Sequence, residues 1–282
     1  MKTKPTMAVV GTGNLGRVLA LALKAAGLRV QEVVSREPRR ATSLAKRVGA
    51  QATRLGDPLT ADVVWICVPD DAIAEVAQKL AKSKTAWRGK VVLHTSGALS
   101  SRELAPLKQK GAAVGSAHPM NTFVKTSRPD LRGVPFAIEG DAAAVRAASA
   151  AGKALGMDVF RIQPANKVLY HAMGAFTSPL LVSTLYAGER VGQAAGIREP
   201  RAVMRRILRE TIENFLRGGS AAAFSGPIRR GDLKTVQRHL RELRKVQGTE
   251  TIYKVLAIQA VHGLPGKEKK AMMKVLGKVA SR

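Results

Sequence analysis

A glycine-rich turn between an apolar run and a helix start is the feature that most restricts this fold. Met7–Val10 is a short apolar run typical of a strand buried on both faces, and apolar residues recur at helical spacing from Leu15 onward. Gly11 suits a tight turn, Gly13 lets the backbone approach a pyrophosphate, and Gly16 lets the helix pack closely on the strand. We therefore predict a dinucleotide site at the helix N-terminus. The expected cofactor contacts in this turn are Gly11, Thr12, Gly13, Asn14, Leu15 and Gly16.

The end of the second predicted strand, residues 28–34, decides between NAD and NADP. An acidic residue at this tip would accept from the ribose 2′-hydroxyl of NAD, but the tip here is Ser35-Arg36, and Glu32 lies inside the strand. Arg36 can pair with a 2′-phosphate, and Ser35 can donate a hydrogen bond to it. The alternative is a solvated basic helix start. We expect NADP (NADPH) rather than NAD.

Strands and helices alternate over the first part of the chain. Apolar runs predict further strands over residues 62–68, 90–93, 112–117, 135–139 and 157–162, with helices over 38–48, 72–82 and 141–155. After Gln163 the pattern is helical only, over residues 165–195, 199–216, 233–247, 249–261 and 267–279. We therefore predict an α/β fold, with a Rossmann domain of doubly wound parallel sheet over residues 1–162 and an all-helical substrate and dimerisation domain over 163–282.

Polar groups follow several strands at the edge where an open parallel sheet binds its ligand. We expect Val68, Pro69 and Ser96 to contact the cofactor, and His118 to act in catalysis or substrate binding. For each strand-end histidine the alternative is a loop histidine bonded to a neighbouring carbonyl.

In the helical half, Lys167 and His171 lie four residues apart and so share a helix face with Ser178. A lysine beside the nicotinamide can donate a proton to a carbonyl that receives hydride, provided that burial or like charge lowers its pKa. The alternative is a surface lysine near a helix start. We take Lys167, His171 and His118 as catalytic candidates.

The turn-rich segment 225–232 carries two arginines before a long helix. Arg230 could bind a substrate carboxylate, whereas Asp232 could simply cap the helix. The expected substrate-binding residues are His118, Ser178, Arg230 and Asp232.

Charge does not by itself indicate nucleic acid. The chain has 47 Lys+Arg against 20 Asp+Glu, a net charge of +27, and residues 167–282 hold 22 basic and 8 acidic residues against 25 and 12 before them. The excess is spread over both halves, and only 4% of residues are aromatic, so we do not expect nucleic acid as a partner. Attraction of an anionic cofactor and substrate explains the charge better.

Several other classes are excluded by what the sequence lacks. The five histidines and one cysteine show no metal-ligand spacing, so we expect no metal. No Walker loop or Gly-x-Ser-x-Gly motif supports a kinase or hydrolase. Glycines interrupt the apolar N-terminal segment, and the longest uncharged run, residues 172–188, is short for a membrane span. A single Cys67 fits a reducing cytoplasm, where we expect the protein.

The chain resembles Rossmann-like bacterial proteins with a helical C-terminal domain of unknown function, related to pyrroline-5-carboxylate reductase, ketopantoate reductase and the 6-phosphogluconate dehydrogenase superfamily. The motifs that carry the resemblance are Gly11–Gly16, His94–Gly97, Gly115–Met120, Lys167–His171 and Gly226–Asp232. The resemblance implies an NADP-dependent reductase, often dimeric through its helical domain, with Lys167 as proton donor. His171 stands where many relatives have Asn, and Pro179 follows Ser178 where the closer family has Asn.

We therefore expect an NADP-dependent oxidoreductase that transfers hydride between the nicotinamide and a small carbonyl, hydroxy or imine substrate in the cleft between the domains. A homodimer and a small-molecule substrate are the expected partners, without a membrane. Ketopantoate reductase-type activity is one alternative, since some close relatives are thought to reduce ketopantoate. A nucleotide-binding sensor or scaffold protein without catalysis is the other.

Overall fold

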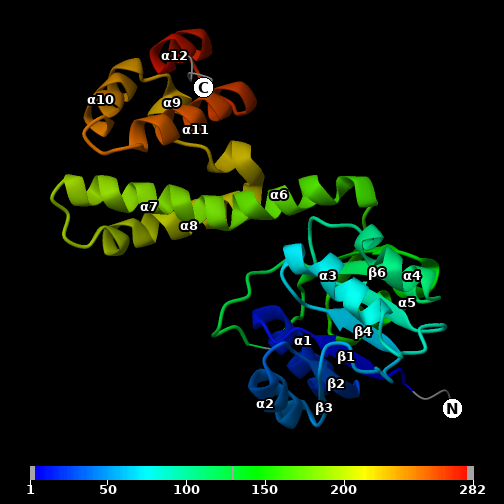
Figure 1. The fold of residues 1–282 in the computed structure, drawn as a ribbon. Coiled ribbons are helices and arrows are strands. Elements are labelled where there is room, and N and C mark those ends of the chain that lie inside the picture. The colour runs from blue at the N-terminus through cyan, green and yellow to red at the C-terminus, as the bar shows by residue number, and fades with distance from the viewer. Residues whose placement is uncertain (1–3, 129, 278–282) are drawn as a thin grey trace. The chain divides into compact units, whose positions relative to one another are not determined.

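The computed structural model describes residues 4–128 and 130–277 and divides the chain into two compact units (Figure 1). The first unit, which we call the sheet unit, extends to Phe176, and the second, the helical unit, begins at Thr177. The strands end at Arg161, so the first helix after them still belongs to the compact body of the sheet unit.

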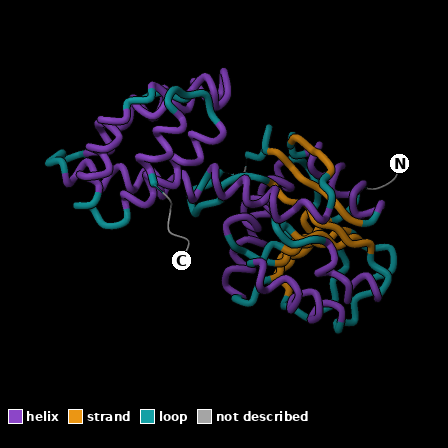
Figure 2. The backbone as a smooth tube through the Cα atoms, turned by 90° about the horizontal axis from the view of Figure 1, so that it is seen from above, coloured by secondary structure: helices purple, strands orange, loops and turns teal. Residues whose placement is uncertain are grey.

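The sheet unit contains one eight-stranded sheet in the order β3-β2-β1-β4-β5-β6-β7-β8. The strands are β1 Met7–Val10, β2 Val30–Val34, β3 Gln51–Thr53, β4 Val63–Ile66, β5 Val91–His94, β6 Ala113–Pro119, β7 Pro135–Gly140 and β8 Asp158–Arg161. Strand order reverses between β1 and β4, and dinucleotides bind at such a reversal in doubly wound folds. The predicted α/β fold class is confirmed, and Figure 2 shows the strands between helices.

Two strands, β7 and β8, run opposite to the other six strands of the predicted parallel sheet. β6 and β7 are antiparallel, with His118 opposite Ala137, and β8 is parallel to β7. A parallel return needs a crossover of a dozen or more residues, usually a helix, and the connection 120–134 has no helix among its described residues. The three-residue β3 was also missed, because so short a strand has no readable period.

Helices cover both faces of the sheet. One face packs against α1 Asn14–Ala25, α2 Pro38–Val48 and α5 Ala142–Ala154, and the other against α3 Asp70–Ala81, the 3₁₀ turn Ser101–Leu104 and α4 Ala105–Gln109. Trp65 and Phe136 fill the first core, with ring centroids 6.4 Å apart. Burial on both faces is why β1, β4 and β5 read as continuous apolar runs.

Helix α6, Lys167–Thr177, ends where a single long helix was predicted. Ser178 has φ −127° and ψ −88°, and Pro179 begins the next helix, α7, which extends to Ala194. Proline lacks the amide proton that a continuing helix would need and disfavours helical geometry in the residue before it, so the predicted helix 165–195 is interrupted.

The remaining helices of the helical unit are α8 Pro200–Ala223, α9 Pro227–Arg230, α10 Leu233–Leu243, α11 Thr249–Gly263 and α12 Lys269–Leu276. α8 runs past its predicted end and kinks at Gly219, where φ is 72°. The predicted end of the last helix, Val279, lies outside the described residues.

Among the described residues of the helical unit, one group of helices forms a hydrophobic core. The buried apolar side chains come from α10, α11 and α12, namely Val236, Leu240, Ala257, Val261, Met272 and Leu276. α7 buries none of its residues, and α8 buries only Pro200 among those described. Large apolar side chains such as Val182 on α7 and Ile207 and Leu216 on α8, which are 62%, 67% and 74% exposed, therefore face outward.

Within the described part of the chain, one helical segment, residues 164–194, is long and apolar enough to cross a membrane by length and composition alone. Lys167 in its first turn is fully buried, with its amine hydrogen-bonded to Ser96 and Ser116 of the sheet unit. That end of the segment is thus part of a folded domain. The expectation of no membrane partner stays a prediction.

Candidate active site

The three glycines of the turn after β1 differ in the space around them, and only one of them has room for a side chain. Gly11 has φ 107°, and a Cβ there would lie 2.2 Å from the carbonyl oxygen of Cys67. A Cβ on Gly16 would lie 2.0 Å from the carbonyl oxygen of Gly11. On Gly13, however, a Cβ would meet no described atom within 4 Å. The fold itself needs the first and third glycines, whereas the second borders space that the protein does not fill.

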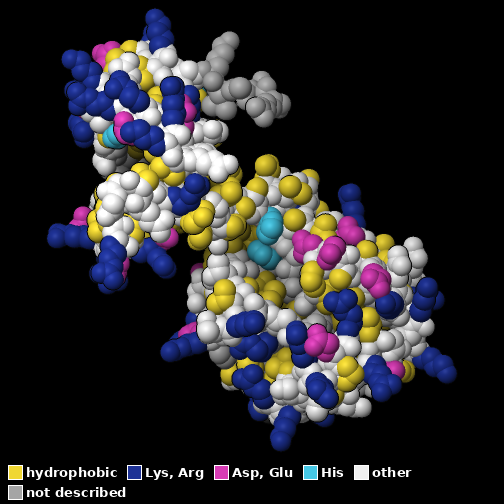
Figure 3. Space-filling view, turned by 60° about the vertical axis from the view of Figure 1, so that its left-hand side comes forward, with side chains coloured by type: hydrophobic (Ala, Val, Ile, Leu, Met, Phe, Trp, Pro, Cys, Tyr) yellow, Lys and Arg dark blue, Asp and Glu magenta, His cyan; other side chains and the backbone are white. Residues whose placement is uncertain are grey.

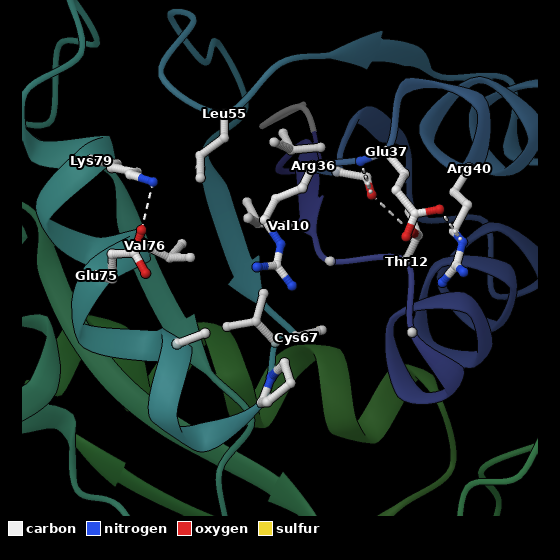
Figure 4. A pocket seen from close by; sticks show the side chains of 17 residues that line it. Val10, Thr12, Arg36, Glu37, Arg40, Leu55, Cys67, Glu75, Val76 and Lys79 are labelled. Carbon is white, nitrogen blue, oxygen red and sulfur yellow. Dashed lines mark hydrogen bonds and ion pairs between the residues drawn. The ribbon is translucent and has the colours of Figure 1, made fainter.

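A cavity of about 240 Å³ opens beside this turn, at the reversal of strand order (Figure 4). The predicted cofactor residues that line it are Gly11, Thr12, Gly13, Ser35, Arg36, Val68 and Pro69. Asn14, Leu15, Gly16 and Ser96 do not line it. Asn14 instead donates from Nδ2 to the carbonyl of Phe123, at 2.9 Å, and so holds the segment after β6.

Three basic side chains and two carboxylates line the cavity, namely Arg36, Arg40, Lys79, Glu37 and Glu75. Arg36 projects into its middle, between the ion pairs Glu75–Lys79 and Glu37–Arg40, whose atoms are 2.6 and 2.8 Å apart (Figure 4). The hydroxyl of Ser35 lies 3.0 Å from that of Thr12 and accepts from the amide of Glu37 at 3.2 Å. Arg40 is already paired with Glu37, so Arg36 is the basic group best placed to bind an additional phosphate.

Glu32 is unavailable to a ribose. It is buried in β2, and its carboxylate accepts from the amide and hydroxyl of Thr60, both at 2.7 Å, and from the amide of Ala61 at 3.1 Å. The open Gly13 position, the cavity and the arginines together fit a dinucleotide that carries a 2′-phosphate.

Apart from the cavity, several polar side chains lie together on one face of β5, β6 and β7. His94 pairs with Ser116, which pairs with Glu139 on the other side, so their side chains share a face. His118 follows Ser116 by two residues and therefore points to that face as well. We refer to His94, Ser96, Ser116, His118, Lys167, Tyr170 and His171 as the lysine cluster.

Lys167 lies at the centre of this cluster and is completely buried. Its Nζ donates to the carbonyl oxygen of Ser96 at 3.0 Å and to the hydroxyl of Ser116 at 2.7 Å. Burial lowers the pKa of Lys167 to about 8, although the carboxylates of Glu139 and Asp70 partly oppose that shift.

Neither of those carboxylates is bonded to the lysine. Glu139 accepts from the amide and hydroxyl of Ser101 at 2.7 and 2.8 Å, and Asp70 accepts from the hydroxyl of Ser96 at 2.7 Å. The ammonium group is thus held by neutral oxygen atoms alone among the described residues.

The cluster's histidines have different surroundings. His94 is fully buried, with Nε2 2.9 Å from the carbonyl of Ser100 and Nδ1 accepting from the amide of Ser96, and burial lowers its pKa to about 4. His118 is partly buried, and burial together with the charge of Lys167 lowers its pKa to about 3. Both are neutral at physiological pH. His171 is exposed, with its ring centroid 5.9 Å from that of His118.

Sequence reasoning missed Ser116 and Tyr170. The hydroxyl of Tyr170 lies 3.0 Å from Nδ1 of His118, and Tyr170 stands three residues after Lys167 on the same helix face. Strand alternation with His118 and the spacing of three from Lys167 were the signals that could have identified them.

The remaining predicted substrate residues belong to the helical unit. Ser178 lies at the interruption before α7, and Arg230 ends the short helix α9. Asp232 caps α10, because its Oδ1 accepts from the amide of Thr235 at 3.0 Å. The structure therefore joins Lys167, His171 and His118 in one cluster of the sheet unit. A substrate-binding role for Ser178, Arg230 and Asp232, which belong to the other unit, stays a prediction.

Basic side chains do not gather in a single patch on the face of each unit that Figure 3 shows. Figure 3 shows Lys and Arg side chains scattered over the visible face of each unit. Among residues 4–128 and 130–277, no group of three or more His, Cys, Asp or Glu side chains could hold a metal ion.

Comparison with known proteins adds family information to this geometry. Residues 6–97 match the family described as NADP oxidoreductase coenzyme F420-dependent, and residues 134–260 match the Domain of unknown function (DUF2520). Residues 6–97 are thus similar to an NADP oxidoreductase Rossmann domain, and residues 134–260 are similar to a DUF2520 domain. The expected enzyme class and the expected cofactor, NADP, are thereby confirmed at the level of the family.

Solved structures share the fold along almost the whole chain. A candidate NADP oxidoreductase, BF3122 from Bacteroides fragilis, is 24% identical, with a TM-score of 0.76 over 91% of this chain and 97% of that one. Protein TM1727 from Thermotoga maritima is 25% identical, with a TM-score of 0.72 over 96% and 98%. An imine reductase from Myxococcus stipitatus, solved with NADP⁺, is 16% identical, with a TM-score of 0.67 over 97% and 100%. The comparison with curated proteins finds no match.

Proposed function

We propose that the chain is an NADPH-dependent reductase that transfers hydride to a small carbonyl or imine compound at the lysine cluster. The observation that carries this proposal is a fully buried lysine whose ammonium has no bonded carboxylate among the described residues. Burying a charge is costly unless it is paired, so packing alone gives no reason to retain Lys167 there. Charged groups with a shifted pKa in such positions are often functional.

The cluster lies at the carboxyl ends of β5 and β6, on the ligand-binding edge of the sheet. When bound, NADPH supplies a hydride. As the substrate double bond accepts it, negative charge develops on the substrate oxygen or nitrogen, and the ammonium of Lys167 stabilises that charge. Complete burial limits direct proton transfer from Lys167, so we assign it this electrostatic role first; its role as acid or base stays a prediction.

A substrate panel distinguishes between carbonyl and imine substrates. The imine reductase from Myxococcus stipitatus is 16% identical to this chain, and at that identity the similarity shows the fold alone. NADPH consumption should be followed with a panel of small ketones, keto acids including ketopantoate, cyclic imines and coenzyme F420. We expect turnover with at least one carbonyl or imine. Tight NADPH binding without turnover of any compound would favour the sensor or scaffold alternative.

We also propose a homodimer through the helical unit. Apolar side chains such as Val182 on α7 and Val203 and Ile207 on α8 are more than half exposed. Arg205, Arg206 and Arg209 are interspersed among them, which disfavours insertion into lipid. Light scattering should report a dimer, and Ile207→Glu should shift it toward monomer. A wild-type monomer at micromolar concentration would contradict this proposal.

A further inference from the structure

We propose that Tyr170 donates the proton to the substrate's carbonyl oxygen and that His118 positions its hydroxyl. This inference rests on the reductase function proposed above, and it narrows the substrate class to carbonyl compounds. Tyr170 follows Lys167 by three residues on the α6 face that carries the lysine cluster, and its hydroxyl lies 3.0 Å from Nδ1 of His118.

The imidazole of His118 is fixed on several sides. Its ring meets that of Tyr170 edge to face, with centroids 5.5 Å apart and an interplanar angle of 88°, and that of His171 at 5.9 Å and 77°. A Cβ on Gly97 would lie 2.9 Å from both Cε1 and Nε2 of His118. Phe160 packs edge-on against Tyr170, with centroids 6.0 Å apart. The phenol and the imidazole therefore face each other in one defined geometry.

The other titratable groups of the cluster are less suited to proton donation. Lys167 is completely buried, and His94 uses both ring nitrogens within the fold. Burial keeps His118 neutral, and His171 is exposed. Tyr170 is half-buried and carries a proton across the physiological range, because burial raises its pKa to about 12.

The proton of Tyr170 moves to the substrate oxygen as hydride reaches the carbonyl carbon. As hydride bonds to the carbonyl carbon, the electron pair of the C=O double bond moves to oxygen, which forms a bond to the phenolic proton of Tyr170. The O–H bond of Tyr170 breaks, and water returns a proton to the phenolate. An alkoxide is a stronger base than a phenolate, so the transfer is favourable. With its proton on Nδ1, His118 donates to the phenolic oxygen and leaves the proton of Tyr170 free for the substrate.

The test compares Tyr170→Phe with the matched control Tyr186→Phe, since Tyr186 is 60% exposed on α7. We expect Tyr170→Phe to lower kcat with a reduced ketone by about 100-fold, while NADPH affinity is unchanged. Tyr186→Phe should match wild type. Retention of wild-type kcat in Tyr170→Phe would overturn the donor role.

A readout without substrate tests the pair itself. Nitrogen NMR of the imidazole should show a proton on Nδ1 of His118, and Tyr170→Phe should shift that resonance while Tyr186→Phe does not. An unprotonated Nδ1 that is insensitive to Tyr170→Phe would overturn the positioning role. If wild type reduces no carbonyl in the panel, the reductase proposal or its carbonyl branch fails with the donor role. If wild type turns over and Tyr170→Phe equals it, only the donor role fails.

Discussion

The cofactor cavity and the lysine cluster lie on the same sheet edge but are built in opposite ways. The cavity keeps space open beside Gly13, and Arg36 projects into it between two ion pairs of its lining. The cluster fills its space with hydrogen-bonded polar groups and buries the charge of Lys167 completely. The difference separates two tasks, because a large ligand needs room and matching charge, whereas hydride chemistry needs a fixed field with little water.

The largest effect should come from removing the buried charge. We expect Lys167→Met to lower turnover by about 1,000-fold and leave NADPH affinity unchanged, because the charge acts on the developing transition state. The free energy of unfolding should not fall, since methionine avoids the desolvation of an ammonium group. Steady-state kinetics, cofactor titration and denaturant unfolding measure these quantities. A variant that is active but unfolds readily would make Lys167 a structural residue.

The glycine turn allows a matched pair of substitutions. Gly13→Ala should leave the melting temperature unchanged and weaken NADPH binding about 100-fold, because its Cβ enters only the space meant for the ligand. Gly16→Ala should destabilise the fold by about 1–3 kcal/mol, because its Cβ would meet the Gly11 carbonyl oxygen. Thermal melts and fluorescence titration separate the two. If the two variants lost the same amount of melting temperature and of NADPH affinity, Gly13 would not differ from Gly16 in bordering ligand space.

Coenzyme preference should change less. We expect Arg36→Ala to raise the Kd for NADPH by about 10- to 100-fold and leave that for NADH unchanged, since the guanidinium pairs with the 2′-phosphate. Arg39→Ala is the control, because Arg39 is exposed on α2 and does not line the cavity. If Arg36→Ala raised the Kd for NADPH and the Kd for NADH by the same factor, Arg36 would contribute to binding of both coenzymes rather than to recognition of the 2′-phosphate.

The smallest effect concerns acid stability. The pKa of His118 falls from 6.5 to about 3 in the folded protein. Below pH 6.5 the unfolded chain therefore binds a proton at this site that the folded protein does not, and stability declines as the pH falls toward 3. Between pH 6.5 and 4, the free energy of unfolding of His118→Gln should decline less than that of wild type. A variant of the exposed His262 should show the same decline as wild type. Identical pH profiles for His118→Gln and wild type would contradict the buried neutral imidazole.

Residue patterns within a short segment predicted those elements whose structure depends on that segment alone. The β1 run, the glycine turn and α1 lie within residues 7–25, so their residue types and spacing suffice. The direction of β7 is not encoded in its own residues, because it depends on a connection without a helix. The interruption at Ser178 was readable from Pro179, yet the continuous apolar pattern masked it.

The lysine cluster was only partly predictable for a related reason. The helical spacing of Lys167 and His171 identified their shared face. The burial of Lys167, however, comes from bonds to residues 71 and 51 positions away in sequence, Ser96 and Ser116. Such contacts arise from the pairing of β5 with β6, which sequence spacing alone does not give.

The hydrogen bonds of Glu32 have a consequence for coenzyme redesign. The one acidic residue of β2 is locked to Thr60 and Ala61, so it cannot turn toward a free ribose diol. Deleting Arg36 alone would therefore yield a protein that handles both nicotinamide coenzymes poorly. A switch to the non-phosphorylated coenzyme would require a new carboxylate at the strand tip, for which Ser35→Asp is the natural choice.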